Sequence, residues 1–265
     1  EIKKMIDDLS SSVKREKLIP PQEYTNALIA ARKQIDQKDY QSAIASLDRL
    51  EEEVQKGIRN LKKLDISNNA SYHFFFSMME YSLFENYYKD EKRTVYMLPY
   101  DYVSLLSLRA QAYFFIGDAE KWKENIRLAL KYNPTSVDLL FLSADMNCQC
   151  FNYFSFMMDL DKMYPFLYKE NDIKKYYRYL SKYYSDFETN NRLSRTLLKI
   201  GDQNNSIKKT LSSLTKKQKD FLDKYQIPYE VSPLVIKTAL KEAKQAIESN
   251  DIPGYKYFYS ILIPY

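Results

Sequence analysis

The residue types that most often perform catalysis or bind metal ions are scarce in this sequence. The 265-residue chain contains one histidine, His73, and two cysteines, Cys148 and Cys150. A catalytic histidine needs an orienting partner and a nucleophile nearby, and no sequence pattern supplies either. Because His73 lies within the aromatic run 72–76, we expect it to have a packing or surface role.

The two cysteines do not complete a metal site. A structural zinc site needs about four ligands, usually from paired cysteine or cysteine–histidine sets. Residues two apart on one helix point to different faces, so we expect no disulfide between Cys148 and Cys150. We therefore expect buried, inert cysteines and no bound metal ion or cofactor.

Carboxylate side chains are plentiful, and pairs such as Asp159 and Asp161 could lie at the separation found in glycosidases. Such pairs also occur on any helical surface, so we expect these carboxylates to lie on solvated helix faces. The GxGxxG, GxxxxGKS/T, HExxH and GxSxG motifs are absent from the sequence. Their absence argues against the common nucleotide-binding, zinc-protease and serine-hydrolase classes. The sequence therefore predicts no catalytic residues and a protein that is not an enzyme.

The strongest local charge is a lysine-rich segment, residues 206–225. Its apolar residues recur at helical spacing, which predicts one basic amphipathic helix followed by a linker up to residue 231. The apolar stripe consists of Ile207, Leu211, Leu214, Phe221, Leu222 and Tyr225. Such a helix could contact nucleic acid or anionic lipid. The alternative is a solvated basic face, because the segment also contains Asp220 and Asp223.

The charge balance of the whole chain argues against a nucleic-acid partner. Its 40 basic and 35 acidic side chains leave a net charge of +5 and a pI of about 8.8. Nucleic-acid-binding domains typically have a pI of roughly 9 or more. No apolar run approaches the roughly 20 residues of a membrane span, so we also expect no transmembrane segment.

The elements that carry these side chains are predicted to be helices. Apolar residues follow the 3.6-residue period almost throughout the chain. Only four glycines are present, whereas sheets and phosphate-binding loops need glycine for tight turns and close backbone approach. With 45% hydrophobic and 28% charged residues, the composition is that of a folded soluble protein. We therefore expect an all-α protein with negligible strand.

The clearest unit is the window 103–136, which predicts two antiparallel helices around a Gly117-Asp118 turn. Small residues recur where paired helices must approach, and large residues recur where gaps must be filled. The pattern consists of Leu106, Ala110, Tyr113, Gly117-Asp118, Ile126, Ala129 and Pro134. In type and spacing it resembles the tetratricopeptide repeat (TPR), a helical hairpin. Trp122 departs from the pattern at a position that is normally alanine, so we expect this hairpin to splay or twist.

Other windows fit the same register less closely: 24–57, 137–170, 174–207 and 236–265. Residues 71–88 predict a very apolar helix, so we interpret 71–102 as a degenerate repeat whose second helix is short or missing. The resemblance is to degenerate repeats, most like those of bacterial TPR proteins. It implies an all-α, right-handed α-solenoid of about five or six TPR-like helical hairpins.

The predicted organisation is a single repeat domain over residues 1–265. It begins with a leading helix within residues 1–20, which caps the stack and ends at Pro20-Pro21. The segments that follow are the repeats at 24–207, the basic helix and linker at 206–231, and a terminal hairpin at 232–265.

A TPR stack presents a concave groove, and the resemblance implies that fixed positions of each first helix line it. The residues expected to bind the partner are Gln111, Phe114, Phe115, Phe141, Asp145, Lys175, Arg178 and Lys182. The last three are spaced by three and four residues, which places them on one helix face. A peptide with acidic residues beside bulky apolar ones would complement this groove. The alternative is that these cations are solvated or pair with neighbouring carboxylates. We expect a protein-interaction scaffold whose partner is a protein or peptide.

Two further functions are compatible with the sequence. The chain could be a ligand- or peptide-sensing regulatory domain of a larger protein, with a DNA-binding helix-turn-helix before Glu1. It could also be an exported or surface TPR module whose leader is removed before Glu1. Without such a leader, we expect a cytoplasmic protein. The sequence leaves the oligomeric state open.

Overall fold

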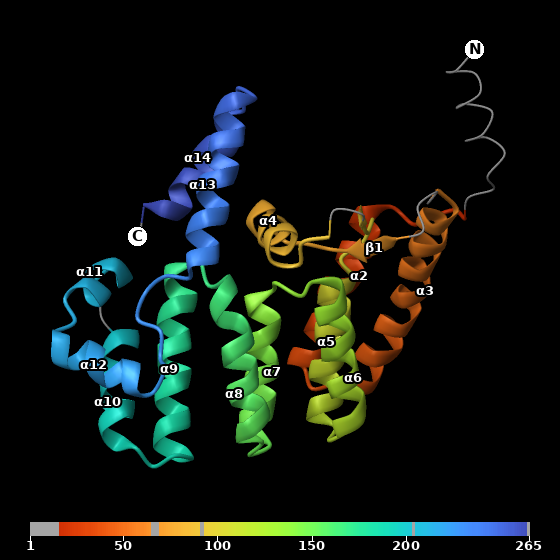
Figure 1. The fold of residues 1–265 in the computed structure, drawn as a ribbon. Helices are drawn as coiled ribbons and strands as arrows, with labels where there is room; N and C mark the ends of the chain where they lie inside the picture. The colour runs from red at the N-terminus through yellow and green to blue at the C-terminus, as the bar shows by residue number, and fades with distance from the viewer. Residues whose placement is uncertain (1–15, 65–68, 91–92, 203–204, 264–265) are drawn as a thin grey trace. The chain divides into compact units, whose positions relative to one another are not determined.

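The computed structural model describes residues 16–64, 69–90, 93–202 and 205–263. Within these ranges the chain forms thirteen α-helices, one short 3-10 helix and two short strands. This result confirms the prediction of a mainly helical protein (Figure 1). The leading helix predicted within residues 1–20 lies outside the described residues, apart from 16–20, which are not helical.

The chain forms two compact units. Unit 1 consists of residues 1–75 and 90–134, and unit 2 consists of residues 76–89 and 135–265. The boundary after residue 134 lies near the end of the clearest predicted repeat, whereas the degenerate window 71–102 is shared between the units. Both of its strands belong to unit 1, and its helix belongs to unit 2.

The described part of unit 1 consists of four helices and a two-stranded sheet. Its elements are α2 (Pro21–Asp36), α3 (Tyr40–Leu64), β1 (Ala70–His73), β2 (Thr94–Met97), α5 (Tyr102–Phe115) and α6 (Ala119–Tyr132). Helix α3 packs against α2 and α5, and α5 also packs against α2 and α6 (Figure 1). At one end of this core, Tyr24 stacks on Tyr100 with 4.5 Å between the ring centroids.

Burial agrees with the register of the clearest window. Ala110 of α5 and Ala129 of α6 have no exposed surface, and Trp122 of α6 is 2% exposed. The indole lies edge-on to Phe114 with 5.9 Å between the ring centroids. Small side chains at the two alanines permit the helices to approach closely, while the hairpin buries the large Trp122 side chain.

The described part of unit 2 consists mainly of helical hairpins. Its elements are α4 (Met78–Tyr87), α7 (Val137–Gln149), α8 (Tyr153–Met163), η1 (Tyr164–Phe166), α9 (Glu170–Asp186), α10 (Asn191–Gly201), α11 (Ile207–Ser212), α12 (Lys216–Lys224), α13 (Pro233–Glu248) and α14 (Ile252–Leu262). Helix α8 packs against α7 and α9, and α9 packs against α10, so these helices form a row (Figure 1). Helix α13 packs against α14 and α4.

The five helical hairpins of the described chain turn in a similar way. In each, a residue with positive φ follows the first helix, and an Asp or Asn caps the second. The positive-φ residues are Lys38, Gly117, Phe151, Thr189 and Asn250. The capping residues are Asp39, Asp118, Asn152, Asn190 and Asp251, and each accepts a hydrogen bond from the backbone N–H three residues later. Because the left-handed residue and the cap satisfy the groups left open at the two helix ends, local sequence specifies each turn.

The helix predicted over 71–88 begins only at Met78, so this part of the prediction is wrong. Ser77 starts α4 by accepting a hydrogen bond from a backbone N–H at 3.1 Å. The residues before it form β1, which pairs in parallel with β2 and stacks Tyr72 on Tyr96 at 5.7 Å. Aromatic side chains favour strands when they can pack across a pair. The two strands have four residues each, so the described chain contains little strand, as the sequence predicted.

The lysine-rich segment 206–225 forms two short helices where one was predicted. Residues 213–215 separate α11 from α12, and Thr215 starts α12 through a capping box with Gln218. This reciprocal pair of hydrogen bonds is a helix start signal that outweighs the continuous apolar spacing. Ile207 and Leu222 have no exposed surface, so the predicted apolar stripe is divided between two helices.

Candidate functional site

The predicted groove residues lie on three helices. Gln111, Phe114 and Phe115 belong to α5 of unit 1. The residues in unit 2 are Phe141 and Asp145 on α7, and Lys175, Arg178 and Lys182 on α9.

Two of the three groove residues in unit 1, Phe114 and Phe115, form an aromatic group at the C-terminal end of α5. Phe115 is 55% exposed and stacks on Tyr40 with 5.2 Å between the ring centroids. Phe114 is half-buried between Phe115 and Trp122. The Gln111 amide donates a hydrogen bond to a carbonyl of its own helix at 3.3 Å. Phe115 therefore offers the largest open surface of the three.

In unit 2, three predicted residues meet around a residue that the sequence analysis did not select, Tyr179. The Lys175 ammonium lies 4.1 Å from the centroid of the Phe141 ring and 5.1 Å from that of Tyr179. The Tyr179 hydroxyl donates a hydrogen bond to Asp145, and burial together with this carboxylate raises the pKa of the phenol. Phe141 is only 2% exposed. The Phe141 ring is thus covered by Lys175 and Tyr179, which lie four residues apart on one face of α9.

The other two cations predicted to line the groove, Arg178 and Lys182, have different partners. The Arg178 guanidinium donates to the Gly201 carbonyl at 2.9 Å and lies 3.7 Å from the Asp202 carboxylate. Arg178 therefore gives a hydrogen-bond donor to a carbonyl at the C-terminus of α10, where the helix dipole is negative. Lys182 is exposed and lies 3.9 Å from the Asp186 carboxylate, one turn further along α9. Each of the three cations thus has a partner within unit 2: aromatic rings for Lys175 and carboxylates for Arg178 and Lys182.

A second group of aromatic side chains lies at the turns of the α7–α8 and α9–α10 hairpins. We call this group the aromatic rim: Phe151, Tyr153, Phe154 and Phe187. The three phenylalanines are 78%, 75% and 53% exposed, in that order. Tyr153 connects the two hairpins, because its ring stacks on Phe187 at 5.3 Å and lies edge-on to Phe151 at 6.4 Å. Exposed large apolar side chains gathered in this way are typical of an interaction surface.

Phe151 has an unusual backbone conformation for a bulky residue. Its φ is 56°, at the position where a helix ending of this type usually has glycine. The Phe151 N–H bonds to the Cys148 carbonyl at 3.0 Å, and the Asn152 N–H bonds to the Asn147 carbonyl at 2.8 Å. The turn at Gly117 has the same pair of backbone bonds and does contain glycine. The run 151–156 has four aromatic residues beside a helix cap, a sequence signal that the prediction did not use.

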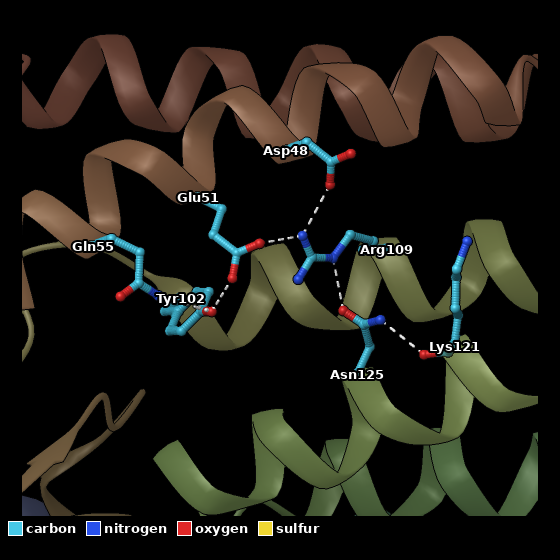
Figure 2. A network of polar contacts seen from close by, with 7 residues as sticks. All are labelled: Asp48, Glu51, Gln55, Tyr102, Arg109, Lys121 and Asn125. Carbon is cyan, nitrogen blue, oxygen red and sulfur yellow. Dashed lines mark hydrogen bonds and ion pairs between the residues drawn. The ribbon is translucent and has the colours of Figure 1, made fainter.

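A partly buried polar network joins three helices of unit 1, as Figure 2 shows. Arg109 of α5 is 9% exposed; its guanidinium donates to the Asp48 carboxylate at 2.9 Å, to Glu51, and to the Asn125 amide oxygen at 2.7 Å. The Tyr102 hydroxyl also donates to Glu51. Burial by itself raises the pKa of Glu51, but the hydrogen bonds from Arg109 and Tyr102 more than offset it, and the pKa lies below its ordinary value. The charges are mutually satisfied, so we assign the network a role in joining α3, α5 and α6.

The histidine lies inside unit 1. His73 is 6% exposed, and its Nδ1 atom lies 3.2 Å from the Tyr132 carbonyl oxygen. Burial lowers the pKa of His73 to about 4, so the ring is neutral at pH 7. The ring stacks on Phe75 at 5.4 Å, an arrangement that fits the packing role expected from the sequence.

Two expectations about polar side chains need correction. Both cysteines are free thiols, but Cys148 is half-buried and Cys150 is exposed, so the prediction of buried cysteines is wrong for Cys150.

Asp159 is 6% exposed instead of solvated and accepts a hydrogen bond from the Asn147 amide at 2.9 Å. Burial raises the pKa of this carboxyl group. The reason is that the α7–α8 hairpin turns the Asp159 face inward, which helical spacing alone did not reveal.

The described residues contain neither a metal-binding cluster nor a membrane-spanning helix. In the described parts of the chain, no group of three or more His, Cys, Asp or Glu side chains is arranged to hold a metal ion. None of the described helices combines the length and apolar character needed to cross a bilayer.

Comparison with protein-family models, with curated proteins and with solved structures finds no match to this chain. The candidate site is therefore the aromatic rim, which has the largest exposed aromatic side chains among the groups described above. These rings can bury against the apolar side chains of another molecule.

Proposed function

We propose that this chain is a helical-repeat binding module that recognises a protein partner through the aromatic rim of unit 2. Phenylalanine and tyrosine bury large areas on binding and are enriched at the centres of protein interfaces. The turns that carry the rim are fixed by caps and by paired backbone bonds, so little ordering entropy is lost when a partner binds.

The exposed ring of the left-handed Phe151 is the observation that carries this proposal. A left-handed backbone costs a bulky L-residue roughly 1–2 kcal/mol, and the 78% exposed ring gains little burial in return. Gly117 and Asn250 occupy the same turn position and tolerate this conformation, whereas Lys38 and Thr189 are also left-handed there, so the backbone alone does not single out Phe151. What singles out Phe151 is that its large ring is also exposed beside Phe154 and Phe187, which a function in binding explains.

We also propose that the five hairpins belong to a degenerate TPR-like solenoid. The support is the recurrence of one turn type, a left-handed residue followed by an Asp or Asn cap, at the same place in each hairpin. In this proposal Phe115 and the Lys175–Phe141 contact belong to groove surfaces, and the rim belongs to the turns. The free thiols suit a reducing compartment, so we propose the cytoplasm. We propose binding, with no catalysis, as the activity.

The test compares the proteins captured by the wild type and by a rim variant, Phe151→Asn combined with Phe154→Ser. The control is Lys38→Asn, because Lys38 has the same left-handed turn position outside the rim. Proteins retained from a cell lysate are identified by mass spectrometry, and binding of the strongest candidate is then measured with purified protein. We expect the control to retain the partner and the rim variant to lose at least tenfold in affinity.

Two results would contradict the proposal. One is a purified partner that binds the rim variant as tightly as the wild type. The other is a wild-type protein that dimerises in sedimentation velocity experiments through the rim and binds no other protein, which would identify a second copy as the occupant.

A further inference from the structure

A pocket of about 300 Å³ lies between the two lysine-rich helices and the linker that follows them. Its charged and polar lining side chains are Lys208, Ser212, Lys219, Tyr229 and Glu230, and its apolar lining consists of Leu211, Val231 and Ile236. All of these residues belong to unit 2. The volume is at the small end of the range for ligand sites, roughly 300–1,000 Å³.

The linker wall of this pocket is held in place by three hydrogen bonds. The Tyr177 hydroxyl donates to the Pro228 carbonyl at 2.8 Å, and the Tyr164 hydroxyl donates to the Glu230 carbonyl at 3.0 Å. The Ser232 hydroxyl donates to the Pro165 carbonyl at 2.9 Å. Because Tyr177 and Ser232 are buried, these bonds fix the backbone on both sides of Tyr229. The pocket is therefore formed before any ligand arrives.

The opposite wall presents two cations. Lys208 of α11 and Lys219 of α12 have no ion-pair partner among the residues that the structure describes. The Lys219 ammonium lies 5.7 Å from the centroid of the Tyr229 ring, whose hydroxyl donates to Asp223 at 3.2 Å. Glu230 is the one acidic side chain in the lining, so the charged lining groups sum to one positive charge.

We propose that this pocket binds an organic carboxylate that carries a compact apolar group. The anion lies between the Lys208 and Lys219 ammonium groups, and the apolar group contacts Leu211 and Ile236. A carboxylate matches the single excess positive charge, and the apolar lining excludes a small hydrated anion. The ligand is either a free acid or the C-terminal residue of a peptide, since both present the same chemistry. This inference is independent of the aromatic rim.

The test uses two pairs of probes that differ only in charge. The free-acid pair is 3-phenylpropanoate and 3-phenylpropanamide, and the peptide pair is N-acetyl-glycyl-leucine and its C-terminal amide. Binding is followed by ¹⁵N chemical-shift changes in the intact chain. We expect at least one carboxylate to bind at least tenfold more tightly than its amide, with the largest shifts at the lining residues. The pair that binds more tightly identifies the source of the ligand.

The matched variants are Lys208→Met with Lys219→Met, and the control Lys217→Met, an exposed lysine of α12 that does not line the pocket. All should melt at the temperature of the wild type, because surface lysines contribute little to stability. We expect the double variant to bind at least tenfold more weakly and the control to bind normally. Equal binding of acid and amide, an equal loss in the Lys217→Met control, or binding only to anionic lipid vesicles would overturn the proposal.

Discussion

Arg109 and Asn125 join the two helices of the clearest hairpin through a hydrogen bond of 2.7 Å from the guanidinium Nε atom to the amide oxygen. The Nη1 nitrogen of the same guanidinium donates to both carboxylates of α3, so one side chain connects three helices (Figure 2). We expect Arg109→Met to lower the free energy of unfolding by about 2 kcal/mol, because the half-buried Glu51 carboxylate loses the guanidinium. Urea denaturation measures this change. The control Arg127→Met, at an exposed site of α6, should change stability by less than about 0.5 kcal/mol.

Phe151→Asn should make the protein more stable while it weakens partner binding. Asparagine tolerates the left-handed conformation that costs phenylalanine roughly 1–2 kcal/mol, so we expect a gain of up to about 1 kcal/mol. Thermal and urea unfolding measure the gain. Lys38→Asn should give a similar gain with normal partner binding. A Phe151→Asn protein that is less stable than the wild type would mean that the ring stabilises the fold, and the functional interpretation of its conformation would fail.

Ala110→Leu and Ala129→Leu should each destabilise unit 1. Neither alanine has exposed surface, and added methylene groups in a packed core cost about 1–3 kcal/mol. Ala119→Leu is the matched control, because Ala119 is exposed at the start of α6. Urea denaturation of the three variants compares them directly. Equal stability of all three would show that α5 and α6 do not pack in the register described above.

The buried His73 should make stability depend on pH between about 4 and 6.5. The pKa is about 4 in the folded chain and 6.5 in the unfolded chain, so the unfolded state binds more protons in this window. The free energy of unfolding should therefore fall as the pH is lowered from about 6.5 to about 4, by at most about 3 kcal/mol. A His73→Phe variant should lose this part of the pH dependence in urea denaturation series. Parallel pH profiles for the wild type and the variant would show that His73 is not buried as described.

The sequence by itself determined the features that depend on neighbouring residues. Helical periodicity and scarce glycine predicted the mainly helical fold, because contacts between residues three and four apart define a helix face. The turn at Gly117-Asp118 was predicted because its cap and left-handed residue act within a few positions. The spacing that places Lys175, Arg178 and Lys182 on one face of α9 is also local, although the groove as a binding surface stays a prediction.

Tertiary structure decided the features that depend on residues far apart in the chain. Tyr72 is in a strand because it pairs with Tyr96, and a strand pairing cannot be read from local spacing. Arg109 is charged and buried because α3 supplies two carboxylates about 60 positions earlier. The exposure of Phe151 depends on how the α7–α8 and α9–α10 hairpins meet. Local sequence sets which backbone bonds form within a turn, whereas the packing of separate helices determines which side chains lose contact with water.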